Sequence, residues 1–280
     1  MTAQPPEKMD GGNIYRGRKV ALLTQHGKER VIAPVPEASL RCRVLHVTGY
    51  DTDRLGTFTR EVPRAGTQLE AARTKARIGM ELSGLSIGLA SEGSFGLDPF
   101  TGMLPWNVEM LVFGIEVVGC ASGGKTNFSH RLTASWEEAK QFACGAGFPE
   151  HWLVIRPEGE AHPQIRKGIA SWDELEKAFH WACGLATNGC AFLETDMRAH
   201  ANPTRMEMIA LAARDLAQKL RAPGFYATER LAGLPCEACG APTRETRAEV
   251  YRCPRCEHQL IVERNEAKTA SAARCDYCNP

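Results

Sequence analysis

The 280-residue sequence lacks any apolar run close to the roughly 20 residues that a membrane-spanning helix requires. It also lacks an excess of charge, because 34 basic residues nearly balance 33 acidic ones. A net charge of +1 argues against tight nonspecific binding of nucleic acid. No repeat of solenoid length is visible, and the first residues contain no apolar segment typical of signal peptides. We therefore expect a cytoplasmic protein that does not enter a membrane.

The length and the pattern of apolar residues predict two folded parts. A chain of 280 residues has the length of about two average domains. Helix-like and strand-like segments alternate over residues 18–222, which predicts an α/β domain with a mixed sheet and flanking helices. We expect residues 1–17 to be a disordered lead-in and residues 223–234, which begin with Pro223, to be a linker. Residues 235–280 are predicted to form a small zinc ribbon.

The segment 66–96 is the centre of the predicted α/β domain. Thr67 and Glu70 form a capping box, and the apolar residues that follow repeat at helical spacing, so a helix is predicted to end at Ser83 and Gly84. Residues 85–90 predict a buried strand, residues 91–96 a sharp turn, and residues 49–64 a polar loop over the site. Other strands are predicted at 19–23, 42–47, 152–156 and 190–194, with a hairpin or one long strand at 109–120. Further helices are predicted over 29–38, broken early by prolines, and after Ser135, Ser171 and Asn202.

Six of the eleven cysteines form Cys-x-x-Cys pairs, all beyond residue 235. The pairs are Cys236 and Cys239, Cys253 and Cys256, and Cys275 and Cys278. The first two pairs, joined by a possible hairpin around 245–251, predict a tetrahedral zinc site of four thiolates, with iron or redox chemistry as lesser alternatives. The third pair has no obvious partner pair. It could bind a metal together with His258, replace a pair in the first site, or bind across an oligomer.

Four charged residues are candidates for phosphate chemistry: Glu70, Glu92, Lys28 and Lys75. If the helix packs antiparallel to the strand, the two carboxylates meet and can hold a divalent ion, while the lysines bind phosphate. Ordinary structural roles explain the same residues. Glu70 can be only a helix cap, Glu92 can mark a turn, and the lysines can be solvated. Asn202 can likewise be only a cap, so these patterns alone leave the function open.

Four N-terminal segments, LLTQHGKERVI, CRVLHV, LEAARTKAR and IGLASEGSFG, carry a resemblance to a known fold family. They resemble the inosine/xanthosine triphosphate pyrophosphatases, a family that includes the Maf-like proteins. The segment LETDMRAHANPTRMEMIALAARDL is similar in kind to the base-reading helix of that family. The whole chain also resembles a bacterial family known only as a domain of unknown function. Residues 97–190 have no convincing counterpart in the pyrophosphatases, and the first loop is one residue shorter.

The resemblance implies roles for individual residues. Glu70 and Glu92 would bind Mg²⁺, and Glu92 would also help to activate water. Lys28 and Lys75 would bind phosphate groups. The implied contacts to the nucleotide are Thr24, His26, Asn202 and Arg205.

The sequence therefore predicts Mg²⁺-dependent hydrolysis of a nucleoside triphosphate, or of a related phosphoanhydride, with release of pyrophosphate. Two alternatives stay open. One is a protein that binds a nucleotide or nucleic acid without turnover, although the balanced charge does not favour nucleic acid. The other is an inactive scaffold whose zinc ribbon docks a protein partner. The shortened first loop fits altered or lost chemistry, and the sequence does not indicate an oligomeric state.

Overall fold

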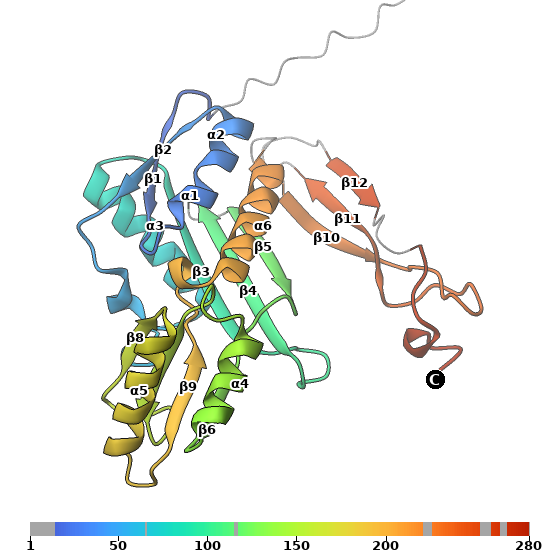
Figure 1. The fold of residues 1–280 in the computed structure, drawn as a ribbon. Coiled ribbons are helices and arrows are strands. Elements are labelled where there is room, and N and C mark those ends of the chain that lie inside the picture. The colour runs from blue at the N-terminus through green and yellow to red at the C-terminus, as the bar shows by residue number, and fades with distance from the viewer. Residues whose placement is uncertain are drawn as a thin grey trace, which may run out of the picture. The chain divides into compact units, whose positions relative to one another are not determined.

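The computed structural model describes residues 15–64, 66–114, 117–220, 226–252, 259–263 and 268–279. The chain divides into two compact units, one formed by Gly17–Ala217 and the other including residues 218–280. The first unit is a mixed α/β fold in which helices flank two sheets, as the sequence predicts (Figure 1). Within the described residues, no helix is long and apolar enough to cross a membrane.

A five-stranded mixed sheet with the order β2-β1-β3-β4-β5 positions most of the polar candidates. Its strands are β1 (Lys19–Leu23), β2 (Arg43–Val47), β3 (Gly88–Leu97), β4 (Pro105–Phe113) and β5 (Val117–Gly123). Strand β1 pairs in parallel with β2 and β3, whereas β3, β4 and β5 pair antiparallel. The apolar run of β1 suits this central place because residues 20–23 are buried.

Two predictions about the strands are decided by this sheet. Residues 109–120 contribute to both β4 and β5, so the hairpin alternative is correct. The sharp turn predicted at residues 91–96 is wrong, because β3 continues to Leu97. The chain turns after Asp98 instead, whose carboxylate accepts hydrogen bonds from the backbone N–H groups of Phe100, Thr101, Met103 and Leu104.

The helices begin where the sequence places their caps. They are α1 (Glu29–Ile32), α2 (Pro34–Leu40), α3 (Gln68–Ser83), α4 (Trp136–Ala146), α5 (Trp172–Leu185) and α6 (Pro203–Leu220), with short 3₁₀ turns η1 (Thr52–Leu55) and η2 (Ala199–Ala201). Prolines break the predicted 29–38 helix into α1 and α2. Helix α3 packs close to β1 and β3 because glycines lie where the elements meet, Gly79 on the helix and Gly88 in β3. A Cβ on Gly79 would lie 3.1 Å from the Cβ of Leu23. This close approach brings Lys75 of α3 to Glu92, in the middle of β3.

Residues 130–195, most of which have no convincing counterpart in the pyrophosphatases, build a second sheet. The strands β6 (His130–Thr133), β7 (Leu153–Pro157), β8 (Arg166–Ile169) and β9 (Ala191–Thr195) pair antiparallel in the order β6-β9-β7-β8. Apolar residues of α4 and α5 pack with β7 and β9 into one core cluster that includes Phe148, Leu153, Leu175 and Phe179. This core holds the loops that precede β6 and follow β9.

The second unit contains a three-stranded antiparallel sheet with the order β10-β11-β12. Its elements are β10 (Tyr226–Ala232), β11 (Thr246–Arg252), β12 (Gln259–Glu263) and the 3₁₀ turn η3 (Ala272–Arg274). Strand β10 lies inside residues 223–234, the segment predicted as a linker, so much of that segment belongs to a sheet. The hairpin predicted around residues 245–251 corresponds to β11 paired with its neighbours.

The approach of α3 to β3 can be tested at Gly88. A Cβ there would lie 2.4 Å from the carbonyl oxygen of Ala76, a backbone atom that cannot move aside. We expect Gly88→Ala to destabilise the protein by about 1–3 kcal/mol, as overpacking does. Circular dichroism melts should show a lower Tm, by roughly 2–4 °C per kcal/mol. Gly96→Ala, in the same strand but with open space around the added Cβ, is the matched control. Equal melting temperatures for the two variants would contradict the packing argument.

Candidate functional site

A cavity of about 290 Å³ in the first unit collects most of the candidate residues. The β1–α1 loop, η1 and the loop after it, α3, β3 and α6 all contribute to its wall. The charged groups in the lining are Lys28, Asp53, Arg60, Arg64, Lys75, Glu92, Arg198 and Arg205, joined by His26. Six basic side chains thus face two carboxylates. The prediction that residues 49–64 form a loop over the site is confirmed for Asp53, residues 56–58, Arg60 and Arg64.

Glu92 on β3 is the buried carboxylate of the cavity. Its Oε1 atom lies 2.5 Å from Nζ of Lys75, and its Oε2 atom lies 3.9 Å from Nη2 of Arg64. Burial raises the pKa of Glu92, but the positive charges of Lys75 and Lys28 outweigh burial and lower it below the usual range. Glu92 is therefore an ionised counter-ion that several cations share.

Lys28 contributes the second buried amine. Its Nζ atom donates a hydrogen bond of 3.3 Å to Oγ of Ser91, the residue before Glu92. Burial, assisted by the charges of Arg205 and Lys75, lowers the pKa of Lys28 to about 7. Near neutral pH the amine is consequently poised between its charged and neutral forms, and a bound anion would favour the charged form.

The excess of positive charge is confined to one part of the cavity. Arg60, Arg198 and Arg205 each have a carboxylate outside the lining, namely Glu194 at 3.0 Å, Asp196 at 3.0 Å and Glu109 at 2.8 Å. Lys28, Lys75 and Arg64, in contrast, share the carboxylate of Glu92, and Lys28 is also attracted by Glu109. Three positive groups that share one carboxylate leave this part of the cavity suited to an anion.

Glu70 does not join Glu92 in the cavity. Its carboxylate accepts hydrogen bonds from the N–H and hydroxyl of Thr67 at 2.7 and 2.9 Å, which closes the predicted capping box. These bonds from Thr67 lower the pKa of Glu70. Glu70 is absent from the cavity lining, so the helix-cap interpretation describes its position in the structure.

The structure does not bring together Glu70 and Glu92, the two carboxylates that were expected to hold Mg²⁺. Mg²⁺ takes octahedral oxygen ligands, commonly one or two carboxylates together with water and phosphate oxygens. The oxygens of Glu92 face Lys75 and Arg64, Asp53 faces His26, and Glu109 faces Arg205. Glu92, the buried carboxylate of the cavity, is therefore already paired with cations, which makes it a poorer ligand for a divalent ion.

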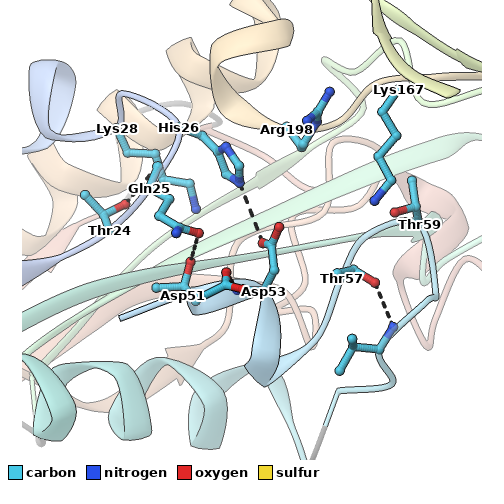
Figure 2. Close-up of polar contacts among 12 residues, drawn as sticks. Thr24, Gln25, His26, Lys28, Asp51, Asp53, Thr57, Thr59, Lys167 and Arg198 are labelled. Carbon is cyan, nitrogen blue, oxygen red and sulfur yellow. Dashed lines mark hydrogen bonds and ion pairs between the residues drawn. The ribbon is translucent and has the colours of Figure 1, made fainter. Parts of the chain in front are cut away.

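The β1–α1 loop places Thr24 and His26 at the cavity. His26 and Gly27 both have left-handed backbones, with φ of 65° and 71°. The Nε2 atom of His26 lies 3.6 Å from Oδ1 of Asp53. Figure 2 draws this contact as a dashed line. The hydrogen bond from His26 is the main cause that lowers the pKa of Asp53. Asp53 was predicted only as part of a polar loop, since a loop residue carries no periodic signal.

Of the two residues predicted on the base-reading segment, only Arg205 lines the cavity. Asn202 is fully buried, where its Oδ1 atom caps α6 by accepting the N–H of Arg205 at 2.9 Å and its amide donates to Asn127. The guanidinium of Arg205 lies 5.1 Å from the ring centroid of Phe95. Asn202 therefore serves as the cap of α6, which was one of its two predicted roles.

Three phenylalanines that the sequence analysis did not single out form an apolar wall of the same cavity. Phe58, Phe95 and Phe128 contact one another with ring centroids 5.5–6.0 Å apart. They come from a loop, from β3 and from the segment before β6, so no spacing in the sequence relates them. The cavity thus combines a cationic part with an aromatic part.

The second unit contains a separate candidate metal centre made of Cys236, Cys239, Cys275 and Cys278. All four Sγ atoms lie within 4.8 Å of one another, with 3.9 Å between Cys236 and Cys278 and 3.6 Å between Cys239 and Cys275. Zn–S bonds of about 2.3 Å place tetrahedral sulfurs about 3.8 Å apart. The four thiols could therefore bind a metal such as zinc.

This cluster corrects the predicted pairing of cysteines. The third pair completes the shell of the first pair, which was one of the open alternatives, so the first pair does not need Cys253 and Cys256. Those two cysteines and His258 lie outside the described residues. Spacing could not select the correct pair, because all three pairs have the same form.

Comparison with protein families matches residues 75–280 to a model described as Domain of unknown function (DUF6671). The chain belongs to the DUF6671 family. No curated protein and no solved structure matches the chain. The part matched to DUF6671 contains Lys75, Glu92, Arg205 and the three cysteine pairs, whereas the loop with His26 precedes it. The resemblance to the pyrophosphatases stays a prediction.

The cysteine pairing can be tested by measuring zinc in purified variants. We expect Cys275→Ser to lose the ion bound by the four-cysteine cluster, because three thiolates leave the tetrahedral shell incomplete. Cys253→Ser should retain that ion, and Cys190→Ser, outside the cluster, is the control. Zinc content by mass spectrometry, together with the thiolate absorption of the cobalt-substituted proteins, reports occupancy. Zinc that is retained in Cys275→Ser but lost in Cys253→Ser would show that the first pair binds the ion together with Cys253 and Cys256.

Proposed function

We propose that the chain binds the phosphate groups of a nucleotide in this cavity and hydrolyses a phosphoanhydride bond, releasing pyrophosphate. The observation that carries the proposal is the group of three cations, Lys28, Lys75 and Arg64, that share the carboxylate of Glu92. Lys28 and Lys75 are buried, and buried cations that lack enough counter-ions are costly to the fold, a cost that an anionic ligand removes.

The other cations support the same proposal because they are already held in place. Glu109 orients Arg205, and Asp196 orients Arg198, through hydrogen bonds of 2.8 and 3.0 Å. Charged groups that are fixed before the ligand arrives lose little freedom on binding. A phosphate chain would meet preorganised positive charge along the cavity, which is also what stabilises the charge that develops in phosphoryl transfer.

The aromatic part of the cavity supports a nucleotide rather than inorganic phosphate. The faces and edges of Phe58, Phe95 and Phe128 offer the kind of surface on which a nucleobase stacks. At about 290 Å³, the cavity lies near the lower end of the size range of ligand pockets, roughly 300–1,000 Å³. Any Mg²⁺ would enter as part of the nucleotide substrate, because Glu92 is already paired with Lys75 and Arg64.

Binding without turnover is the second candidate. It is favoured by the position of Glu92, which the resemblance assigns to water activation but which is held by Lys75 and Arg64. Glu70, the other implied ligand, is engaged by its own helix cap. Both candidates need the same phosphate-binding residues, so a binding measurement and a turnover measurement together separate them.

Pyrophosphate release and pyrophosphate binding test the proposal. We expect release from at least one member of a panel of common and deaminated nucleoside triphosphates in the presence of Mg²⁺. Lys75→Met should reduce both pyrophosphate affinity, measured by calorimetry, and release by about 100-fold or more, which is the effect of about 2.7 kcal/mol. Lys177→Met, on the exposed face of α5, is the matched control. Binding without release would favour the second candidate, and neither binding nor release would overturn both.

The titration of Lys28 predicts how pyrophosphate binding depends on pH. The charged amine binds the anion, and its pKa of about 7 means that the charged fraction falls as the pH rises from 6 to 8. We expect the ratio of wild-type to Lys28→Met affinity to fall over this range. The ionisation of pyrophosphate itself is common to both proteins and cancels in the ratio. A ratio that does not change with pH would contradict the role of Lys28.

The same shift predicts that Lys28→Met is more stable than the wild type without ligand. The pKa of Lys28 is lowered from 10.5 to about 7, so between these values the unfolded chain binds more protons than the folded chain. The destabilisation is therefore complete below pH 7 and disappears as the pH approaches 10.5. Thermal unfolding at pH 6.5 should give a higher Tm for Lys28→Met, and the difference should shrink at pH 9.5.

A further inference from the structure

We infer that His26, positioned by Asp53, accepts the proton of the attacking water; this inference rests on the proposed function. The residue lines the cavity in the β1–α1 loop, next to the phosphate-binding Lys28 in sequence and in space. Figure 2 shows the imidazole directed at Asp53 with Lys28 on the same loop. The resemblance assigned His26 only to ligand binding, so a proton-transfer role comes from the geometry.

Contacts on two sides fix the imidazole of His26. Asp53 Oδ1 lies 3.6 Å from its Nε2 atom, and the ring of His200 stacks on it with centroids 4.8 Å apart and planes 27° apart. His200 is in turn held edge-on by Trp152 at 5.4 Å. The φ of 65° at His26 is uncommon for a residue with a side chain, and residues in strained backbone conformations cluster at active sites.

The alternative proton acceptors are less suitable. Glu92 is ionised but neutralised by Lys75 and Arg64, and a carboxylate whose pKa is lowered by neighbouring cations is a weak base. Lys28 is the remaining rival, because its pKa of about 7 leaves part of the amine neutral. Its Nζ atom, however, lies beside Ser91 and Glu92, where a phosphate would hold it in the charged form.

The charges around His26 come from every element that surrounds it. Asp53 on η1 is the carboxylate beside His26, and several cations lie around this pair. The cations near Asp53 and the stacked His200 are Lys75, Lys167, Arg198 and Arg30, and Lys28 lines the same cavity. Lys167 forms an ion pair with Glu61, and Arg198 forms one with Asp196, so part of their charge is neutralised. The pH profile of the reaction should therefore reflect the His26–Asp53 pair within this cationic surrounding.

The proposed step conserves atoms and charge. The water oxygen forms a new P–O bond, and its proton moves to a ring nitrogen of His26. If Asp53 accepts the Nε2–H group, Nδ1 is the nitrogen free to take the proton. The anhydride P–O bond breaks, and pyrophosphate leaves with the bonding electrons while Lys28 and Lys75 neutralise its charge. The imidazolium, stabilised by Asp53, then returns its proton to solvent.

Kinetics against pH, with pyrophosphate binding measured in parallel, test this inference. We expect His26→Gln to lower kcat for pyrophosphate release by about 10²–10⁴-fold, as loss of a general base does, and to abolish the acidic limb of the profile. Pyrophosphate affinity should stay within about threefold, because the cations remain. Asp53→Asn should lose less activity and move the acidic limb to lower pH, since the imidazolium loses its carboxylate partner. His180→Gln, an exposed histidine on α5, is the matched control.

The outcomes separate this inference from the proposed function. Release by the wild type with an unchanged rate and acidic limb in His26→Gln overturns the role of His26 alone. So does an acidic limb that disappears only in Lys28→Met, or a loss of pyrophosphate affinity in His26→Gln that matches its loss of turnover. No release by the wild type from any nucleotide overturns the proposed hydrolysis and the role of His26 with it. Circular dichroism of each variant confirms that it is folded.

Discussion

The buried ion pair between Lys75 and Glu92 is the interaction on which the rest of the cavity depends. It joins α3 to β3, the two elements at the centre of the first unit, through atoms 2.5 Å apart. Either charge alone would be expensive to bury, by roughly 3–5 kcal/mol when one partner is removed. The pair can form only because Gly79 and Gly88 let the helix approach the sheet closely. The chemistry of the site thus depends on the close packing of α3 against the sheet.

This pair also sets the electrostatics of the cavity. Once Glu92 has neutralised Lys75, the charges of Lys28 and Arg64 remain only partly balanced, although both face the same carboxylate. The arginines from the second sheet and α6 add little to the imbalance, since Glu194, Asp196 and Glu109 accompany them. An anion is therefore favoured at one place in the cavity, next to the aromatic wall and the His26–Asp53 pair.

The parts of this site that can be predicted from the sequence are those fixed by residues close together in the chain. Thr67 and Glu70 form the capping box that starts α3, and this start places Lys75 on the face toward β3. The turn predicted at residues 91–96 is wrong, because one of the glycines that suggested it, Gly93, has another cause. A Cβ on Gly93 would lie 2.5 Å from side-chain atoms of Arg205 and Glu109, so glycine is needed within the strand. Asp53, the phenylalanines and the partner of the first cysteine pair depend on tertiary contacts, which spacing does not encode.

The state of Lys28 argues that this cavity serves a ligand rather than the fold. A buried amine that contributes to stability keeps a normal or raised pKa because its counter-ions offset the loss of water. Here Glu92 and Glu109 attract the amine, yet burial and the repulsion from Arg205 and Lys75 outweigh them, and the pKa falls to about 7. Lys28 therefore destabilises the ligand-free protein at neutral pH, and an apolar side chain of similar length would pack there at lower cost. A phosphate group beside Ser91 reverses this balance, because its negative charge restores the charged amine and turns an unfavourable position into a binding contact.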